Sequence, residues 1–359
     1  MLTCTLDLYT DYLLSSTGPT TATGLSRRLD GALSHDHVTR WLSQTTYGPA
    51  DIWRQAKPLV RQAEAQRSAG EFAVLIVGDS VLAKAHTDAN KLICTHSDHS
   101  QQRYVKGLNF VSLLYQAGEL ALPIAVELVR KTVPVYQPKT QQTSYQSPFI
   151  KNEYLQQMLR VALPGRPQQQ VAYRYLLADS WYASAENMTL VRALGHHFLF
   201  ALESSRTVAL SAAARAVGQF QSVQSLVFPD TQPVRVYLRS VQEAVLVRKQ
   251  VFINQDGSQG LLYLVSSDTD LDQAQLTTIY QRRWKVEEYH KSLKQNASMG
   301  KAPTKTLATQ ATRFFAAVLA YTKLEVLKLK CGIGHFRLKA QLYTVGLKAM
   351  YHQFGQLRA

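Results

Sequence analysis

The chain has 359 residues, enough for two or three domains or for one large domain with an insertion, and its apolar stretches are too short to span a bilayer. Asp7 and Asp11 stand where a secreted protein would carry a cationic leader, and three cysteines without zinc-ligand spacing fit a reducing cytosol. The net charge of +15 is the outlier: residues 281–359 hold 15 Lys and Arg against 3 Asp and Glu, which predicts a nucleic-acid-binding surface rather than a merely solvated basic face.

Residues 1–70 read as helical and precede the first strong strand pattern. Ser34 is expected to cap a helix that runs to Leu42, because apolar residues recur there at helical spacing. Together with the preceding segment Gly24–Gly31, this pattern predicts a helix-turn-helix with Ser34–Leu42 as its recognition helix. A plain helical pair that packs on the main domain is an equal alternative, because the charge of the segment is nearly balanced.

Two apolar runs in the next part of the chain each end in an aspartate, Phe72–Asp79 and Tyr173–Asp179. The other elements expected here are a hairpin of Leu108–Tyr115 with Leu120–Leu128, helices over Asn152–Leu163 and Ala185–Gly195, and a strand over His197–Leu202. This order places Asp79 and Asp179 on adjacent central strands of a mixed sheet. Both would lie at the carboxyl ends of their strands, where ligands of such sheets gather.

After Glu203 the pattern changes to short strands joined by turn residues. Strands are expected over Val234–Val241, Val245–Ile253 and Leu261–Val265, which predicts a small β-rich insertion whose last strand rejoins the main sheet. Helices are then expected from Asp272 past Asn296 and over Ala311–Lys330, the last one ended by Gly332.

One polar helix, expected to include Tyr280 to Lys294, carries the most specific pattern. Tyr280, Arg283, Glu287 and Lys294 are offset by 3, 7 and 14 positions. At about 100° per residue these offsets put all four within roughly 60° on one helical face. An ordinary surface ion pair would explain Arg283 with Glu287 but not the presence of Tyr280 and Lys294 on the same line.

The spacing Tyr-x2-Arg-x3-Glu-x6-Lys resembles the signature of the IS4-like DDE transposases, and the four residues match it without a gap. Gly78-Asp79-Ser80 and Ala178-Asp179-Ser180-Trp181-Tyr182 look like the first and second acidic motifs of that family. The resemblance covers residues 72 to about 330. It implies an α/β fold with an RNase H-like (retroviral-integrase-like) mixed sheet, a β-rich insertion and an N-terminal helical domain.

The expected domain division follows from that resemblance and from the patterns above. Its five parts are a helical, DNA-binding candidate domain at 1–70, the first part of the catalytic core at 71–203, the insertion at 204–260, the second part of the core with the Glu-bearing helix at 261–330, and a basic tail at 331–359.

The resemblance further implies a DNA transposase of an insertion sequence, which moves by cut and paste. Asp79, Asp179 and Glu287 would be the catalytic residues and would hold two Mg²⁺ or Mn²⁺ ions about 3.5–4 Å apart, the arrangement used for in-line phosphodiester chemistry. Tyr280, Arg283 and Lys294 would contact DNA phosphates. In the IS4-like group the freed 3′-hydroxyl commonly attacks the opposite strand to form a hairpin before it joins target DNA.

The expected partners are double-stranded DNA, as terminal inverted repeats and as target, and a second copy of the chain in a homodimeric synaptic complex. No membrane partner is expected, and the expected location is the prokaryotic cytoplasm, in association with the nucleoid. Three rivals remain: an RNase H-like nuclease that cuts without joining, a non-enzymatic DNA-binding derivative, and a glycosidase with paired carboxylates. The intact triad argues against the derivative, and a glycosidase has no use for the basic stripe.

Other polar and aromatic residues have two interpretations each. Asp88, His96, Asp98 and His99 could form a second metal site, but their expected loop setting favours a solvated turn. Candidates to line a DNA groove are Lys84, Arg103 and Lys106. Candidates to stack on a flipped base, or else to fill the core, are Trp181, Trp284 and Tyr237.

Overall fold

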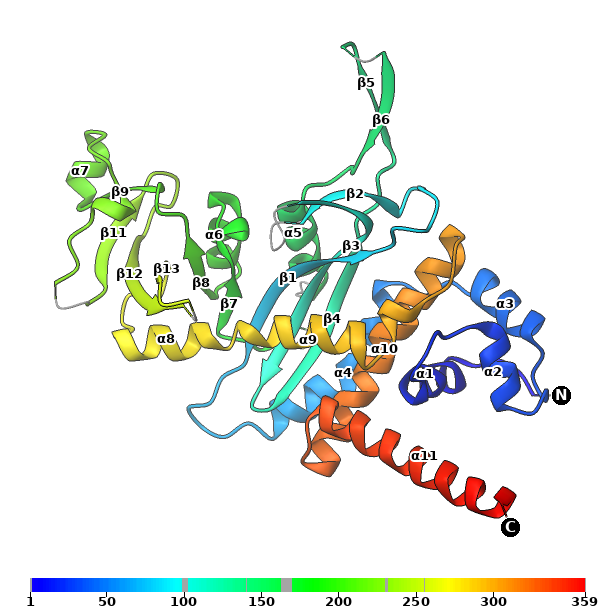
Figure 1. Ribbon diagram of the computed structural model, residues 1–359. Coiled ribbons are helices and arrows are strands. Elements are labelled where there is room, and N and C mark those ends of the chain that lie inside the picture. Colours follow the sequence, from blue (N-terminus) through cyan, green and yellow to red (C-terminus); the bar gives the residue numbers. More distant parts are fainter. Residues whose placement is uncertain are drawn as a thin grey trace.

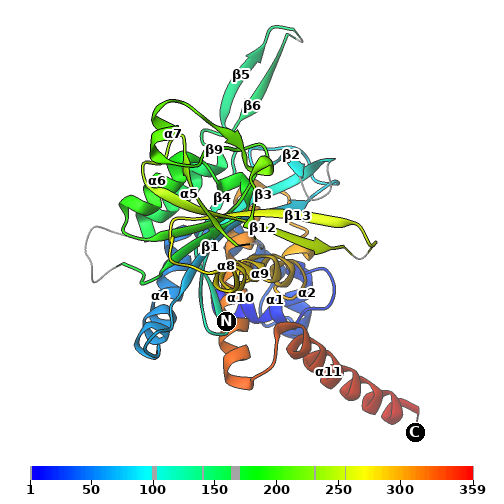
Figure 2. The same cartoon turned by 90° about the vertical axis from the view of Figure 1, so that its left-hand side faces the viewer.

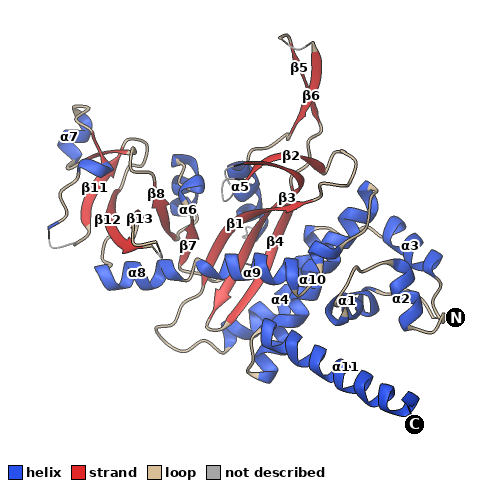
Figure 3. Cartoon of the chain, in the orientation of Figure 1, coloured by secondary structure: helices blue, strands red, loops and turns tan. Residues whose placement is uncertain are grey.

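The computed structural model describes residues 2–98, 103–139, 141–162, 170–229, 232–254 and 256–358. It has a mixed α/β architecture, in agreement with the sequence, with one large sheet between helices (Figures 1 and 3). The helices are α1 (Leu6–Ser15), α2 (Ala22–Arg28), α3 (His35–Gln44), α4 (Pro49–Ala65), α5 (Lys151–Ala162), α6 (Ala185–Ala193), α7 (Ala212–Ala216), α8 (Gln273–Gln281), α9 (Trp284–Gln295), α10 (Leu307–Cys331) and α11 (His335–Arg358), with 3₁₀ turns η2 (Ser180–Tyr182), η3 (Val223–Ser225) and η5 (Met299–Lys301).

The strands of the large sheet come from two parts of the chain. Those before α5 are β1 (Val74–Ala83), β2 (Ile93–Asp98), β3 (Arg103–Ala117) and β4 (Leu120–Leu128), and those after it are β7 (Tyr175–Ala178), β8 (His197–Leu202), β9 (Thr207–Ala209), β10 (Gln221–Ser222), β11 (Val234–Leu238), β12 (Ala244–Ile253) and β13 (Gln259–Ser266). Their order is β10-β9-β11-β12-β13-β8-β7-β1-β3-β2, with β4 also paired to β3.

The pairing at the centre of this sheet decides where the two aspartates lie. β1 pairs in parallel with β7, through Val74–Ile76, and antiparallel with β3 along its whole length. The prediction of adjacent strands is therefore confirmed, and so is the β3–β4 hairpin. The strands expected after Glu203 form β11, β12 and β13, and β13 pairs with β8, so this region continues the same sheet.

The sheet separates two hydrophobic cores, because alternate side chains of each strand point to opposite faces. On one face, β1 residues Val74 and Ile76 pack with α1–α3 and with α8, α9 and α10. On the other, Leu75 and Val77 pack with side chains of α4, α5 and α6. Figure 2 shows the helices α8, α9 and α10 on one side of the strands and α5 and α6 on the other.

The N-terminal helices dock on the C-terminal part of the chain. Ser34 caps α3 as predicted, with its hydroxyl accepting from the amide of His37, and Val38 and Leu42 are buried in the shared core. Lys323 of α10 lies 2.6 Å from Asp7 and 2.8 Å from Asp11, while Lys339 of α11 donates to the carbonyls of Leu14 and Ser16. Lys323 and Lys339 therefore help to hold the N-terminal helices against the C-terminal part of the chain.

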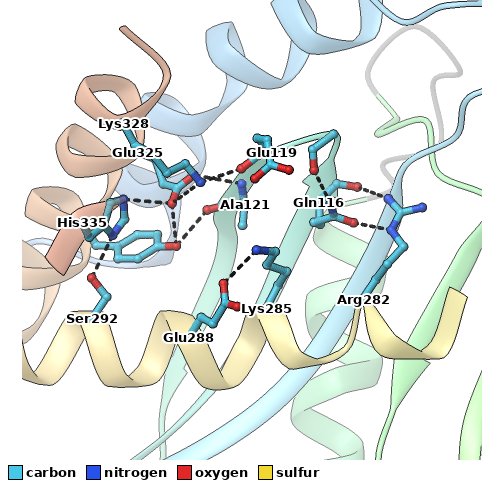
Figure 4. Close-up of polar contacts among 12 residues, drawn as sticks. Gln116, Glu119, Ala121, Arg282, Lys285, Glu288, Ser292, Glu325, Lys328 and His335 are labelled. Carbon is cyan, nitrogen blue, oxygen red and sulfur yellow. Dashed lines mark hydrogen bonds and ion pairs between the residues drawn. The ribbon is translucent and has the colours of Figure 1, made fainter. Parts of the chain in front are cut away.

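A buried polar network joins α9, α10 and α11 to the start of β4 (Figure 4). The Glu325 carboxylate accepts from the Ala121 amide at 3.0 Å and lies 3.0 Å from Nε2 of His335, whose Nδ1 is 2.8 Å from the Ser292 hydroxyl. Burial raises the pKa of Glu325, but hydrogen bonds and charge from His335 and Lys328 outweigh it and lower the pKa overall. The C-terminal residues expected as a basic tail thus form the helix α11, which starts in this network.

Several elements were not expected from the sequence. The β2 strand was missed, and Pro-, Gln- and Ser-rich residues after β4 form a hairpin of β5 (Val133–Gln137) and β6 (Gln142–Gln146). The expected helix end at Leu163 lies outside the described residues. In the described part of the chain no helix is long and apolar enough to cross a membrane.

Candidate active site

The two aspartates lie where β1 extends beyond β7. The parallel pairing ends at Ile76 with Leu177, and Asp179 follows the last residue of β7. The expectation that Asp79 ends its strand is wrong, because β1 keeps its hydrogen bonds to β3 as far as Ala83. Asp79 instead stands in mid-strand, beside the point where β7 stops. The strand register therefore brings Asp79, from the middle of β1, and Asp179, from just after β7, to the same place.

Asp79 has two partners that the sequence analysis did not identify. Its Oδ2 lies 2.6 Å from Nζ of Lys151, the first residue of α5, and each side chain is 17% exposed. Its Oδ1 accepts a hydrogen bond of 3.0 Å from the hydroxyl of the fully buried Tyr182. Tyr182 belongs to the quoted second acidic motif, but no local pattern marks Lys151, because 72 residues separate it from Asp79.

Asp179 is held by the turn that follows it. Its Oδ1 caps η2 by accepting a 3.0 Å hydrogen bond from the amide of Trp181. Burial raises the pKa of Asp179, and the negative charge of Asp79 raises it further, while Arg283 and Lys151 act in the opposite direction. The two carboxylates are thus close enough to repel each other in a poorly solvated place, which favours the arrival of a cation.

The helix α9 reaches this place because Gly78 has no side chain. A Cβ on Gly78 would lie 2.7 Å from Cγ2 of Val286 and 3.4 Å from Cε1 of His290, both on α9. Only a glycine therefore lets α9 pack this closely on β1, one residue before Asp79.

The expected single helix from Tyr280 to Lys294 is two helices, α8 and α9, placed end to end (Figure 1). At the junction, the amides of Arg282, Arg283 and Lys285 bond to carbonyls three residues back, so the backbone tightens. The side chain of Arg282 turns inward there and donates to Gln116 and to the carbonyl of Phe72 (Figure 4 shows the Gln116 contacts). Burial lowers the pKa of Arg282 to about 10.

Glu287 is more exposed than the aspartates and is held by a cation. Its Oε1 is 3.3 Å from Nη1 of Arg283, and its side chain is 47% exposed. Nδ1 of His290 lies 4.0 Å away, but burial lowers the pKa of His290 to about 3, so this imidazole is neutral. Among the described residues no group of three or more metal-ligating side chains is assembled. Asp79 and Asp179 thus lie close together, whereas Glu287 is paired with Arg283 and does not form a group with them.

The other three residues of the motif lie near the middle of β1 and the end of β7. The Tyr280 hydroxyl donates to the carbonyl of Ala178 at 3.3 Å, and Nζ of Lys294 donates to Ser80 at 2.8 Å. The guanidinium of Arg283 lies over the rings of Tyr280 and Trp284, and its positive charge acts to lower the pKa of Asp179. Tyr280, Arg283 and Lys294 therefore surround the two aspartates, each through a neighbouring residue or charge.

The other candidates separate by position. His96 is a buried strand residue of β2 rather than a loop residue, and burial with the nearby Lys131 lowers its pKa to about 4; the suggested partner His99 lies outside the described residues. Lys84 donates to the carbonyl of Ala302 inside the protein. Trp181 and Trp284 are 51% and 62% exposed beside the site.

The donor set at this place fits a hard divalent cation. Carboxylate oxygens are the ligands that Mg²⁺ and Mn²⁺ take, and Asp79 with Asp179 supply them from rigid parts of the sheet. Glu287 could join them only after leaving Arg283, and Lys151 would have to share or leave Asp79.

Two protein-family models match the chain. A model described as a DDE superfamily endonuclease matches residues 3–219, which include Asp79 and Asp179. A model described as a transposase DDE domain matches residues 152–323, which include Asp179 and Glu287. A comparison with curated proteins found no match. Since the first model covers more than half of the chain, and both models contain the second aspartate, the chain belongs to the DDE superfamily of endonucleases and transposases.

Proposed function

We propose that this protein is an IS4-like transposase that cuts DNA at the ends of an insertion sequence and joins them to target DNA. The observation that carries the proposal is the carboxylate pair of Asp79 and Asp179, placed on adjacent parallel strands and flanked by the helix with Glu287. The Tyr-x2-Arg-x3-Glu-x6-Lys spacing supports the IS4-like assignment, and the central β1–β3–β4 and β7 pairing supports an RNase H-like core.

In this proposal Asp79, Asp179 and Glu287 are the catalytic residues and hold Mg²⁺ or Mn²⁺. Two such ions, when bound, would activate the attacking oxygen and stabilise the leaving one. The protein's own side chains prepare the site: Tyr182 orients the Asp79 carboxylate, and the Trp181 amide orients that of Asp179. Release of Glu287 from Arg283 would free both the carboxylate and a guanidinium that can bind a phosphate.

Tyr280 and Lys294 would hold the DNA backbone on either side of the carboxylates. Lys294 of α9 donates to Ser80 of β1, and Tyr280 of α8 donates to the carbonyl of Ala178 of β7, so the two helix side chains lie beside β1 and β7, respectively. A phosphate bound between them would lie across the ends of these strands. Trp181 or Trp284, both exposed here, would then be placed to stack on a displaced base.

The N-terminal helices would contribute recognition of the element's ends. The outward face of α3 carries the exposed residues His35, Thr39 and Arg40, while its opposite face is buried. Because α3 shares a core with α10, deletion of residues 1–70 would expose that core. Substitution of Thr39 and Arg40 tests the role without this loss, and it should lower discrimination between element ends and other DNA.

The deciding experiment uses the full-length protein and the DNA that flanks its coding region. A linear duplex that contains the flanking inverted repeats, with Mg²⁺ or Mn²⁺, should yield nicked ends and then hairpin or joined products. Cleavage without any joined product in the presence of target DNA would favour the nuclease that cuts but does not join. Binding without cleavage would favour a DNA-binding derivative.

A homodimer would bring two element ends together in the synaptic complex, and the proposed location is the cytoplasm with the nucleoid. Mixing of two DNA lengths that carry the same repeat would reveal such a dimer, because paired complexes of mixed length would form.

A further inference from the structure

The hairpin β5–β6 is a separate two-stranded sheet that projects from the body of the protein. Figures 1 and 2, seen from directions 90° apart, both show it standing clear of the large sheet. Its register runs from Val133 opposite Gln146 to Gln137 opposite Gln142. Five residue pairs at about 3.3 Å per residue make an arm roughly 17 Å long before its turn.

This arm exposes aromatic and apolar side chains to solvent. Tyr136 and Tyr145 are 61% and 55% exposed, and the apolar side chains of Val133, Phe149 and Ile150 are exposed around its base. An isolated two-stranded hairpin is marginally stable in water. In the described part of the chain β5 and β6 pair only with each other, so the arm has surface available for a partner.

The charge of the arm selects the kind of partner. From Arg130 to Lys151 the chain holds the cations Arg130, Lys131, Lys139 and Lys151 and no aspartate or glutamate, and its other polar residues are Gln, Ser, Thr and Tyr. Arg130 and Lys139 are exposed. A cationic surface with hydrogen-bond donors and aromatic rings complements a polyanion. A second copy of this chain, itself at +15, is a poorer charge match for this cationic surface than DNA is.

The base of the arm is tied to the candidate active site. Lys131 donates from its amide to the carbonyl of Lys91 and from its Nζ to that of Thr95, which fixes the entry to the arm. The chain leaves the arm at Lys151, whose Nζ contacts Asp79. The base of the arm therefore lies next to the place where Asp79 and Asp179 meet.

We infer that the arm, residues 130–139 and 141–150, binds duplex DNA next to the catalytic carboxylates by lying in its major groove. The major groove of B-DNA admits a two-stranded β-ribbon, and exposed cations on such a ribbon can reach the phosphates that border the groove. This inference rests on the proposed DNA-cutting function and adds the surface that carries the duplex to the site.

The test measures binding of the full-length protein to a labelled linear duplex by fluorescence anisotropy at several salt concentrations. Arg130→Gln with Lys139→Gln removes two exposed cations of the arm. Affinity should fall on the order of tenfold, and the slope of log K against log salt should decrease by about two, since each lost phosphate contact removes about one. Tyr136→Ser with Tyr145→Ser should weaken binding and leave that slope unchanged.

The matched control is Arg235→Gln with Lys249→Gln, which removes the same charge from β11 and β12 in the far part of the sheet. These control substitutions should change the slope little. Equal slopes for the arm variant and the control variant would overturn the inference while leaving the proposed function intact. Thermal unfolding should be unchanged in the arm variants, because the exposed side chains replaced belong to neither core.

Two further outcomes separate a failure of the proposed function from a failure of the role of the arm alone. If the wild-type protein shows no salt-dependent binding to duplex DNA, the proposed function fails and the role of the arm fails with it. If the arm variants keep the wild-type affinity for DNA but lose self-association in light scattering, the arm is a protein interface and the inference is wrong.

Discussion

The candidate site has two halves that differ in how firmly the fold holds them. Asp79 stands on β1 and Asp179 directly after β7; both are poorly solvated and receive hydrogen bonds, from Tyr182 and from the Trp181 amide, respectively. Glu287 stands on α9, is half exposed, and is held among the described residues by an ion pair with Arg283. The comparison teaches that both halves hold a competing cation, Lys151 or Arg283, but that only the sheet half also has hydrogen bonds that orient its carboxylates.

The largest expected effect comes from removing the charge of each half. Asp79→Asn, Asp179→Asn and Glu287→Gln should each lower DNA cleavage by on the order of 10³-fold or more, because each would remove a charge that stabilises the reacting centre. DNA binding should remain in all three. Gel analysis of cleavage with Mg²⁺ and Mn²⁺ checks this, and Ca²⁺ should support binding without cutting. Cleavage by any one variant at the wild-type rate would show that its residue has no catalytic role.

The basic residues of the helix half should matter for strand placement. Lys294→Ala or Arg283→Ala should cost about 1.5–3 kcal/mol in hairpin formation or joining, as expected for a lost charge-assisted phosphate contact, and less in the first nick. Lys291→Ala is the matched control, because Lys291 is exposed and lies over Phe336 instead of facing Ser80. Quantified nicked, hairpin and joined products decide the matter. An equal loss from Lys291→Ala would indicate general basicity instead.

The close packing of α9 on β1, which joins the two halves, can be disrupted by substitution of Gly78. Gly78→Ala would push its Cβ against Val286, which should destabilise the protein by about 1–3 kcal/mol and displace Glu287, so that cleavage also falls. Denaturant unfolding and the cleavage rate are the measurements.

Two companion variants sharpen this prediction. Val286→Ala in the same chain removes the opposing methyl groups and should recover part of both losses. Gly346→Ala is the control, because nothing lies within 4 Å of the added methyl on α11. If Gly78→Ala is as harmless as Gly346→Ala, α9 does not depend on this close approach.

The ammonium group that contacts Asp79 in the sheet half can be removed by substitution of Lys151. Lys151→Met should bind Mn²⁺ roughly tenfold more tightly, since the ammonium no longer competes for Asp79. Isothermal titration measures the affinity. Because Nζ of Lys151 lies 5.4 Å from the ring centre of Trp181, the wild-type protein should also show a tryptophan fluorescence change on Mg²⁺ binding that is smaller in the variant. Weaker binding in the variant would show that Lys151 supports the site in another way.

The smallest effect concerns stability and pH at Asp179. Its raised pKa, caused by burial and by Asp79, means that the folded state holds the proton more tightly than the unfolded chain. The stabilising contribution of the protonated form is complete below the ordinary value of 3.8 and is lost as the pH rises through the raised pKa. Asp179→Asn should therefore melt at a higher temperature than wild type at neutral pH, and the difference should vanish in acid. A lower melting temperature at neutral pH would contradict this.

The sequence alone predicted those elements whose signals are local. The cap at Ser34, the hairpin of β3 and β4, and the end of α10 at Gly332 depend on residues a few positions apart. The strand order also predicted that β1 and β7 are neighbours, because the connection between two parallel strands in one sheet follows few routes. These rules were sufficient to bring Asp79 and Asp179 together.

The tertiary structure decided which distant side chains complete the site. Lys151 and Tyr182 reach Asp79 across 72 and 103 positions, and Arg282 turns inward where a uniform helix was expected. The basic C-terminal residues Lys323 and Lys339 contact the N-terminal helices, a role that the net charge of residues 281–359 did not indicate. The physical reason is common to all of them. Capping and strand periodicity act between near neighbours in the chain, whereas a buried charge takes its partner from whatever the packed core places beside it.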